Sequence, residues 1–319
     1  MRFSMKIRIA LVALCLQMGF ILTPAAFAQE PAPQPGRGAV PAKRGGFMQV
    51  PVDPRVQMRS YLFKDGDISQ NIEYAVFVSS KVSKDKKNPL IVTLHGLGAG
   101  PAIMFGRKAL ELAEEGGYIL VGPMGYNVRG WYGISMRGIR GAKPKPANTG
   151  DAAQPGANPA PKPKPSMSSM FNNPNDPPNL NELSEKDVMN VLDMVRKEFN
   201  VDERRIYLMG HSMGGAGTLY LGVKYRSIWA ALAPIAPAAF SLNPDSLKAI
   251  PSMSVIFVHG DADEMVPVAN TRRWVDKLKE LNMTYEYNEM PGVSHGPIIE
   301  QALPSVYAFF AKHSKQAVH

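Results

Sequence analysis

The stretch Ile206-Tyr207-Leu208-Met209-Gly210-His211-Ser212-Met213-Gly214-Gly215 decides the fold of this 319-residue chain. The apolar run at 206–209 predicts a buried strand, and the pattern of residues 215–225 predicts a helix directly after it. Between them stands the pattern G-x-S-x-G, which is typical of a sharp strand-to-helix turn with a nucleophilic serine at its tip. We therefore expect Ser212 above a sheet edge, at the positive end of a helix dipole.

The segments on either side of this turn alternate between strand and helix patterns. Strands are expected at 72–79, 90–94, 118–121, 206–209, 230–235, 255–258 and 284–288, and helices at 102–115, 183–199, 215–225, 271–281 and 298–312. The run at 230–235 is interpreted as a strand, although its composition also permits a helix. This alternation predicts an α/β fold with a mostly parallel central sheet and helices on both faces.

The first 28 residues have the pattern of a secretory signal peptide. Arg2, Lys6 and Arg8 form a positive start, an apolar run follows at 9–22, and Ala26-Phe27-Ala28 provides small residues for cleavage. An uncleaved membrane anchor is the alternative, but the run is short for a span. The sequence therefore predicts a secreted or periplasmic protein. The chain's one cysteine falls within this segment, so the mature chain would have no disulfide and no cysteine metal site.

Two biased tracts flank or interrupt the rest of the chain. Residues 29–59 are proline-rich and predict a linker, and residues 60–319 predict one catalytic domain. Within that domain, 143–178 is rich in Pro, Lys, Ala and Asn and almost lacks large apolar residues. Such a composition cannot bury enough surface to offset its ordering entropy, so we interpret it as a mobile insertion in a loop.

The net charge of +9 is concentrated outside the predicted core. The signal peptide and the linker carry +3 each and residues 137–179 carry +4, which leaves −1 for the remainder. This distribution argues against a nucleic-acid-binding fold. It predicts only weak electrostatic contact of the two basic tracts with an anionic surface. The sequence makes no prediction about oligomeric state.

A nucleophilic serine needs a base to take its proton, and the base needs an acid to orient it. His295 lies in a loop after the last expected strand, whereas His95 and His259 directly follow strands and are predicted to shape turns. For the acid, Asp261 and Asp263 compete in the segment 258–267. Asp263 is preferred because it lies further into the loop, and Asp261 is expected to bind backbone amides.

The developing oxyanion needs two N–H donors. One is expected from Met213, directly after the nucleophile. The other is expected from Leu97, with Gly98 as the alternative, in the tract His95-Gly96-Leu97-Gly98 after the strand at 90–94. Glycines in this tract allow the backbone to approach a substrate closely.

The loop at 125–133 concentrates aromatic residues between glycines. Tyr126, Trp131 and Tyr132 are candidate substrate-binding residues beside Ser212, although packing beneath a loop is the equally weighted alternative for Trp131. No metal site is predicted, because the acidic cluster at 261–264 lacks the spaced oxygen ligands of a calcium loop. No cofactor is predicted.

Together these motifs resemble the α/β-hydrolase superfamily over about residues 60–315. The segment 201–215 is similar to secreted esterases of the feruloyl esterase and polyhydroxybutyrate-depolymerase-like group, and also to prolyl-oligopeptidase-type catalytic domains. The His95–Gly98 tract is similar to the phospholipase/carboxylesterase group. The resemblance implies the chain order nucleophile, acid, base, which matches Ser212, Asp263 and His295.

The expected function is therefore that of a secreted serine esterase, which cleaves a small-molecule or polymeric carboxylic ester through an acyl-enzyme on Ser212. A serine peptidase of prolyl-oligopeptidase type is the first alternative, although the chain has no room for that group's large N-terminal propeller. A non-catalytic wall-associated binding protein is the second alternative. The sequence does not separate a hydrolase from an acyltransferase, because both form the acyl-enzyme.

Overall fold

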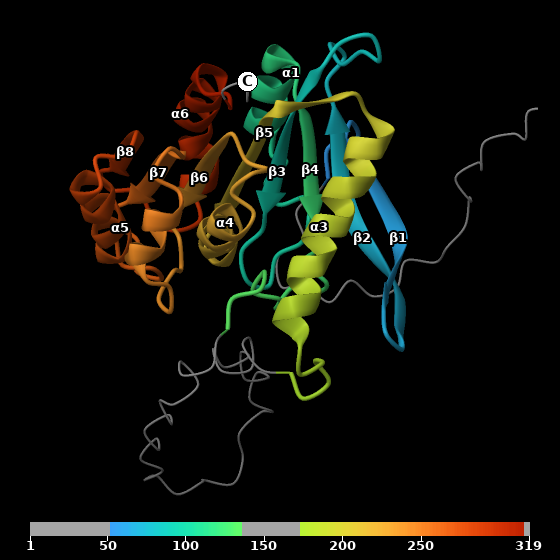
Figure 1. Cartoon of the computed structure of the whole chain (residues 1–319), viewed down its shortest axis with the longest axis horizontal. Helices are drawn as coiled ribbons and strands as arrows, with labels where there is room; N and C mark the ends of the chain where they lie inside the picture. Colours follow the sequence, from blue (N-terminus) through green and yellow to red (C-terminus); the bar gives the residue numbers. More distant parts are fainter. Residues whose placement is uncertain (1–51, 136–172, 316–319) are drawn as a thin grey trace, which may run out of the picture. The chain divides into compact units, whose positions relative to one another are not determined.

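A computed structural model describes residues 52–135 and 173–315 of the chain (Figure 1). The predicted signal peptide, residues 29–51 of the predicted linker and residues 143–172 of the predicted insertion lie outside these ranges. The described residues include every candidate site residue named from the sequence.

The described residues form an eight-stranded sheet with the strand order β1-β2-β4-β3-β5-β6-β7-β8. The strands are β1 (Gln57–Asp65), β2 (Ile68–Val78), β3 (Asn88–Leu94), β4 (Ile119–Pro123), β5 (Val201–His211), β6 (Ala231–Ile235), β7 (Ser254–Gly260) and β8 (Tyr285–Met290). β2 pairs antiparallel with β1 and with β4, and all other neighbours are parallel. The predicted mostly parallel sheet is confirmed. The carboxyl ends of the parallel strands thus share one edge of the sheet.

Helices cover both faces of this sheet, as predicted. They are α1 (Arg107–Gly116), α3 (Leu180–Glu198), α4 (Met213–Lys224), α5 (Ala269–Glu280) and α6 (Ile298–Lys312), with a short 3-10 helix at Pro244–Ala249. α1 and α6 pack together on one face, and α3, α4 and α5 pack on the other (Figure 1). No helix in the described part of the chain has the length and apolar character needed to cross a membrane.

Strand residues alternate between the two cores. In β3, Leu90 and Val92 point to the α3–α4–α5 side, whereas Ile91 points to the α1–α6 side. β5 alternates in the same way, with Leu208 on the first side and Met209 on the second. Because successive side chains of a strand face opposite sides of a sheet, an almost continuous apolar run is what a sheet buried on both faces requires.

Several observed elements differ from the expected ones. β1 has no counterpart in the predicted strands, and it begins at Gln57, within the predicted linker. Its sequence is largely polar because it is an edge strand that is exposed along much of its length. α4 begins two residues before its expected start, directly after Ser212, and α1 begins five residues after its expected start at 102. The interpretation of 230–235 as a strand is confirmed, since β6 is a strand buried throughout.

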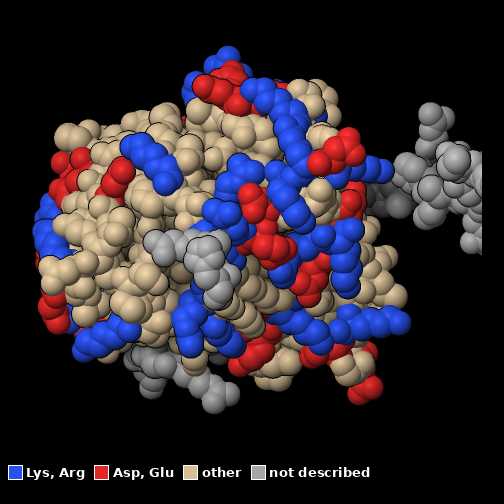
Figure 2. Space-filling view, turned by 45° about the horizontal axis from the view of Figure 1, so that its top comes forward, with Lys and Arg blue, Asp and Glu red and all other residues tan. Residues whose placement is uncertain are grey.

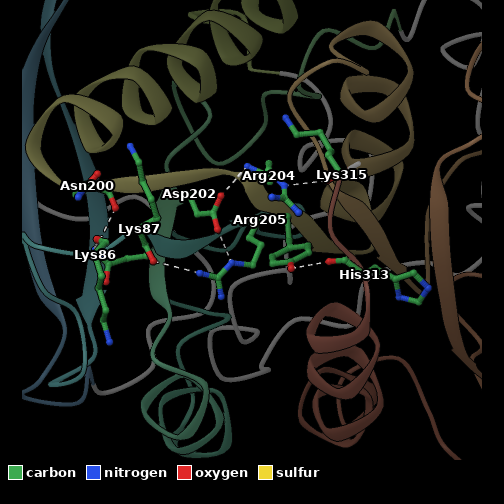
Figure 3. Close-up of polar contacts among 10 residues, drawn as sticks. Lys86, Lys87, Asn200, Asp202, Arg204, Arg205, His313 and Lys315 are labelled. Carbon is green, nitrogen blue, oxygen red and sulfur yellow. Dashed lines mark hydrogen bonds and ion pairs between the residues drawn. The ribbon is translucent and has the colours of Figure 1, made fainter. Parts of the chain in front are cut away.

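Acidic and basic side chains are interspersed on the face shown in Figure 2. At the amino end of β5, the side chains of Arg204 and Arg205 donate hydrogen bonds to backbone carbonyl groups of neighbouring segments (Figure 3). Arg205 pairs with Asp202 at 2.6 Å and donates to Lys87 O at 3.1 Å, and Arg204 donates to Lys315 O at 3.1 Å. These contacts fasten the segment after α6 and the loop before β3 to the sheet, at the edge opposite Ser212.

Candidate active site

Ser212 occupies the turn between β5 and α4 in a strained conformation, with a φ angle of 58° and a ψ angle of −116°. Few residues other than glycine adopt a positive φ, and strain of this kind clusters at functional sites. The flanking glycines are required by space: a Cβ on Gly210 would lie 2.3 Å from Gly214 O, and one on Gly214 would lie 2.1 Å from Leu94 O. The G-x-S-x-G spacing therefore forms the sharp turn that the sequence predicts.

His295 and Asp263 meet at the carboxyl edge of the sheet. His295 lies in the loop between β8 and α6, and its Nδ1 is 2.6 Å from Oδ2 of Asp263, which follows β7. Both residues are buried. Burial alone would raise the pKa of Asp263, but hydrogen bonds from Val266 N and from His295 reverse the effect and hold its pKa below the usual value. Asp263 is therefore an ionised acceptor for the Nδ1–H of His295.

The competing carboxylate, Asp261, has a different partner. Its Oδ1 accepts a hydrogen bond from Gly292 N at 2.6 Å, and the residue is exposed. This contact ties the turn after β7 to the loop that carries His295. The structure thus brings Asp263 to the histidine and places Asp261 on a backbone amide.

His211 links the histidine loop to the serine turn. Its Nε2–H donates to His295 O at 2.9 Å, and the two imidazole rings are 4.4 Å apart. Burial, with a smaller contribution from His295, lowers the pKa of His211 to about 3, so its ring is neutral. From the sequence alone, His211 is only a variable position of the G-x-S-x-G motif. That the residue is a histidine was the available signal for a further role, but its partner, His295, lies 84 residues further along the chain.

Within the described residues, the two predicted oxyanion donors have backbone N–H groups without a hydrogen-bond acceptor. Met213 is the first residue of α4, so its N–H has no acceptor within the helix. The N–H of Leu97 also lacks an acceptor among residues 52–135 and 173–315, whereas Gly98 N donates to Val128 O at 2.8 Å. The backbone at Gly96 runs beside the candidate nucleophile, since a Cβ placed there would lie 3.4 Å from Ser212 Cβ. Leu97 rather than Gly98 therefore retains a donor.

The loop at 95–98 packs on the buried side chain of Tyr132. Its hydroxyl donates to His95 O at 3.0 Å, its ring packs edge-on against the His95 ring at 5.8 Å, and it has no exposed surface. Tyr132 was expected to line a substrate pocket, but a fully buried side chain cannot touch a substrate in this conformation. Its position instead makes it a support for the loop that presents Leu97.

The other two predicted substrate-binding residues lie in the same loop. Trp131 is 6% exposed, which fits the alternative that it packs beneath the loop. Tyr126 is half-buried and packs edge-on against Phe63 at 5.4 Å. The buried Asp187 accepts hydrogen bonds from Gly125 N at 2.7 Å and Tyr126 N at 3.3 Å. The structure therefore brings none of the three aromatic residues to a widely exposed position.

The end of the predicted insertion is attached to this aromatic loop. Arg129 forms two hydrogen bonds of 2.7 Å with Asp176, and Asn127 donates to the same carboxylate at 3.0 Å. The Arg129 and Asp176 side chains are only 17% and 14% exposed. Residues 173–178 were expected to belong to a mobile tract, but this paired carboxylate makes their end of the tract part of the folded domain.

Solved structures share this arrangement of strands and helices. A ferulic acid esterase from the anaerobic fungus Anaeromyces mucronatus superposes with a TM-score of 0.55 at 17% identity, over 84% of this chain and 96% of that one. A thermostable esterase gives a TM-score of 0.55 at 23% identity, over 81% of this chain and 63% of that one. The chain has the α/β-hydrolase fold. At these identities, the superpositions show the fold.

Sequence comparisons agree with this fold. Residues 173–314 of the chain match the phospholipase/carboxylesterase family. A bifunctional acetylxylan esterase/xylanase of Neocallimastix patriciarum is 25% identical over 181 residues, which are 56% of this chain and 20% of the relative. Cutinase 2 of Thermobifida cellulosilytica is 30% identical over 95 residues, which are 30% of this chain and 34% of the relative. The chain thus spans about a fifth to a third of the length of these curated relatives.

Proposed function

We propose that this chain is a secreted serine esterase that cleaves carboxylic esters through an acyl-enzyme on Ser212. The observation that carries the proposal is the 2.6 Å hydrogen bond between His295 Nδ1 and Asp263 Oδ2, in a loop that His211 holds against the Ser212 turn. A strained serine, a histidine and an ionised carboxylate in this relation make up the machinery of serine acyl transfer.

In the first half of the proposed reaction, Nε2 of His295 takes the proton of Ser212 Oγ as the oxygen attacks the ester carbonyl carbon. Asp263 holds the Nδ1–H tautomer and stabilises the imidazolium that forms. The N–H groups of Met213 and Leu97 stabilise the negative charge on the carbonyl oxygen. The tetrahedral intermediate then expels the alcohol, which receives the proton from His295.

In the second half, water takes the place of the alcohol. His295 removes a proton from water, the hydroxide attacks the acyl-enzyme, and the carboxylic acid leaves as Ser212 recovers its proton. The positive end of the α4 dipole lies at Ser212 throughout and favours each anionic intermediate. With water as the second substrate, the proton transfers of both halves are carried by Ser212 and His295, and each bond that breaks is matched by one that forms.

The preference for esters is supported by the relatives, since acetylxylan esterase, cutinase and ferulic acid esterase are all names of carboxylic ester hydrolases. The proposed location outside the cytoplasm rests on the signal-peptide pattern of residues 1–28. The proposed substrate is a small or polymeric ester, without assignment of its acyl chain.

The test is turnover of p-nitrophenyl esters of graded acyl length, a feruloyl ester and a polyester film, together with labelling by a fluorophosphonate. Ser212→Ala should abolish turnover and labelling, whereas Ser294→Ala, an exposed serine beside His295, should retain both. A fully active Ser212→Ala protein would refute the proposal. Turnover of Xaa-Pro amide reporters at rates comparable to esters would instead favour the peptidase alternative.

A further inference from the structure

A second histidine lies against the same carboxylate oxygen of the candidate acid as His295. His259 lies at the end of β7, has no exposed surface and takes no part in the reaction steps described above. Its Nε2 is 2.9 Å from Val266 O and 3.2 Å from Asp263 Oδ2, and its Nδ1 is 2.7 Å from Thr271 Oγ1. The sequence predicted that His259 merely shapes a turn, but these contacts connect the acid to helix α5.

The neighbours of His259 decide which ring nitrogen carries the proton. Val266 O and the ionised Asp263 can only accept hydrogen bonds, so Nε2 must be the donor. Nδ1 then accepts from the hydroxyl of Thr271, which can donate. Burial lowers the pKa of His259, so the ring remains neutral and keeps this single tautomer. Thr271 therefore orients a ring whose N–H donates to Val266 O and lies beside the Asp263 carboxylate.

His259 also lies beside the Asp263 carboxylate. Oδ1 accepts from Met265 N at 2.9 Å and from Val266 N at 2.8 Å, whereas Oδ2 accepts from His295 at 2.6 Å. Nε2 of His259 lies 3.2 Å from the same Oδ2, while its N–H donates to Val266 O. The ring therefore contacts Oδ2 directly and, through Val266, restrains a donor of Oδ1.

We propose that His259 is a positioning residue, which holds Asp263 Oδ2 in line with Nδ1 of His295. The inference rests on the proposed function, because it matters only if His295 is the base. Thr271 restrains His259, His259 restrains Asp263, and Asp263 orients His295. These contacts would hold the reacting imidazole in a fixed position relative to α5 and β7. At metal sites, groups that orient a ligating histidine typically affect activity by about 10- to 100-fold, and we expect an effect of this order from a group that orients Asp263.

Three variants separate this role from simple core packing. His259→Gln retains an N–H donor of similar reach, His259→Leu removes the donor, and Thr271→Val removes the hydroxyl that orients the ring. His313→Leu is the control, because His313 is a partly buried histidine that, like His259, has a backbone contact, Nδ1 to Phe309 O at 2.7 Å, but lies outside the site. Each variant is compared with the wild-type chain for kcat and KM on p-nitrophenyl acetate and for its thermal unfolding midpoint.

The expected result is a fall in kcat of about 10-fold or more for His259→Leu with KM within about twofold, a smaller fall for Thr271→Val, and recovery in His259→Gln. His313→Leu should lose stability without losing kcat. A folded His259→Leu protein with wild-type kcat overturns the inference, as does a His259→Gln protein no better than a folded His259→Leu. If His259→Leu does not fold, Thr271→Val with wild-type kcat overturns it equally. A wild-type chain without Ser212-dependent turnover refutes the proposed function itself.

Discussion

Replacing Asp263 by asparagine tests the proposed chemistry with almost no change of shape. The carboxylate accepts from two backbone N–H groups at Oδ1 and from His295 at Oδ2, and Oδ2 also lies 3.2 Å from Nε2 of His259. An asparagine has one acceptor oxygen and one NH₂ group. The backbone donors of Met265 and Val266 cannot rotate away, so the amide oxygen must face them. The NH₂ group then faces His295 and His259.

The consequence for the base follows from this orientation. An NH₂ group donating to Nδ1 of His295 forces the imidazole proton onto Nε2, where the ring can no longer accept the proton of Ser212. The same change in a serine-histidine-aspartate triad lowers kcat by about 10⁴. That factor corresponds to about 5.4 kcal/mol of transition-state stabilisation. We therefore expect Asp263→Asn to fold and to lose activity by about this factor.

The assay is kcat for p-nitrophenyl acetate together with the rate of fluorophosphonate labelling. Asp261→Asn is the control, since its amide oxygen can still accept from Gly292 N on the exposed surface. It should stay within about twofold of wild type, because exposed substitutions rarely cost more than about 0.5 kcal/mol. Retention of about a tenth of wild-type turnover in Asp263→Asn, or an equal loss in Asp261→Asn, would show that the carboxylate is assigned wrongly.

Three further predictions concern stability. Burial raises the pKa of Asp187 from 3.8 to about 6, so wild type loses about 3 kcal/mol of stability as the pH rises from below 3.8 to above 6. In urea denaturation, the stability of Asp187→Asn relative to wild type should be about 2–3 kcal/mol more favourable at about pH 8 than at about pH 4, and equal differences at the two pH values would contradict this. Gly214→Ala, with its Cβ 2.1 Å from Leu94 O, should lower the unfolding free energy by about 3 kcal/mol, and an unchanged melting temperature would rule out the steric argument. Arg129→Gln breaks the half-buried pair with Asp176 and should cost about 1–3 kcal/mol in thermal denaturation, whereas a cost near zero would mean that the pair is not stabilising.

The parts of the site that the sequence predicts well are local. The turn at Ser212 is encoded by an apolar run, two glycines and a helical pattern within about twenty residues, and steric exclusion at Gly210 and Gly214 explains why no other spacing serves. The preference for Asp263 over Asp261 followed from depth in a single loop. In such cases the neighbours in sequence are also the neighbours in space.

The parts that could not be predicted depend on contacts between distant segments. Tyr132 looked like a pocket residue because it is aromatic and lies in a glycine-rich loop, yet its hydroxyl binds His95 O, 37 residues away. His211 and His259 looked like turn residues, and nothing in their flanking sequence indicates that one holds the His295 loop and the other contacts Asp263. β1 escaped detection because an exposed edge strand carries polar residues on both faces.

The position of β3 has a consequence for how the chain could be divided. β3 lies in the middle of the sheet between β4 and β5, and the chain passes from β4 to α3 through residues 136–172. A cut in that connection would leave Leu97 on one fragment and Ser212, Asp263 and His295 on the other. Neither fragment would hold a complete oxyanion site. Ester turnover would therefore measure how well the two fragments reassociate through the pairing of β3 with β5. The chain could in this way be used as a split-enzyme reporter.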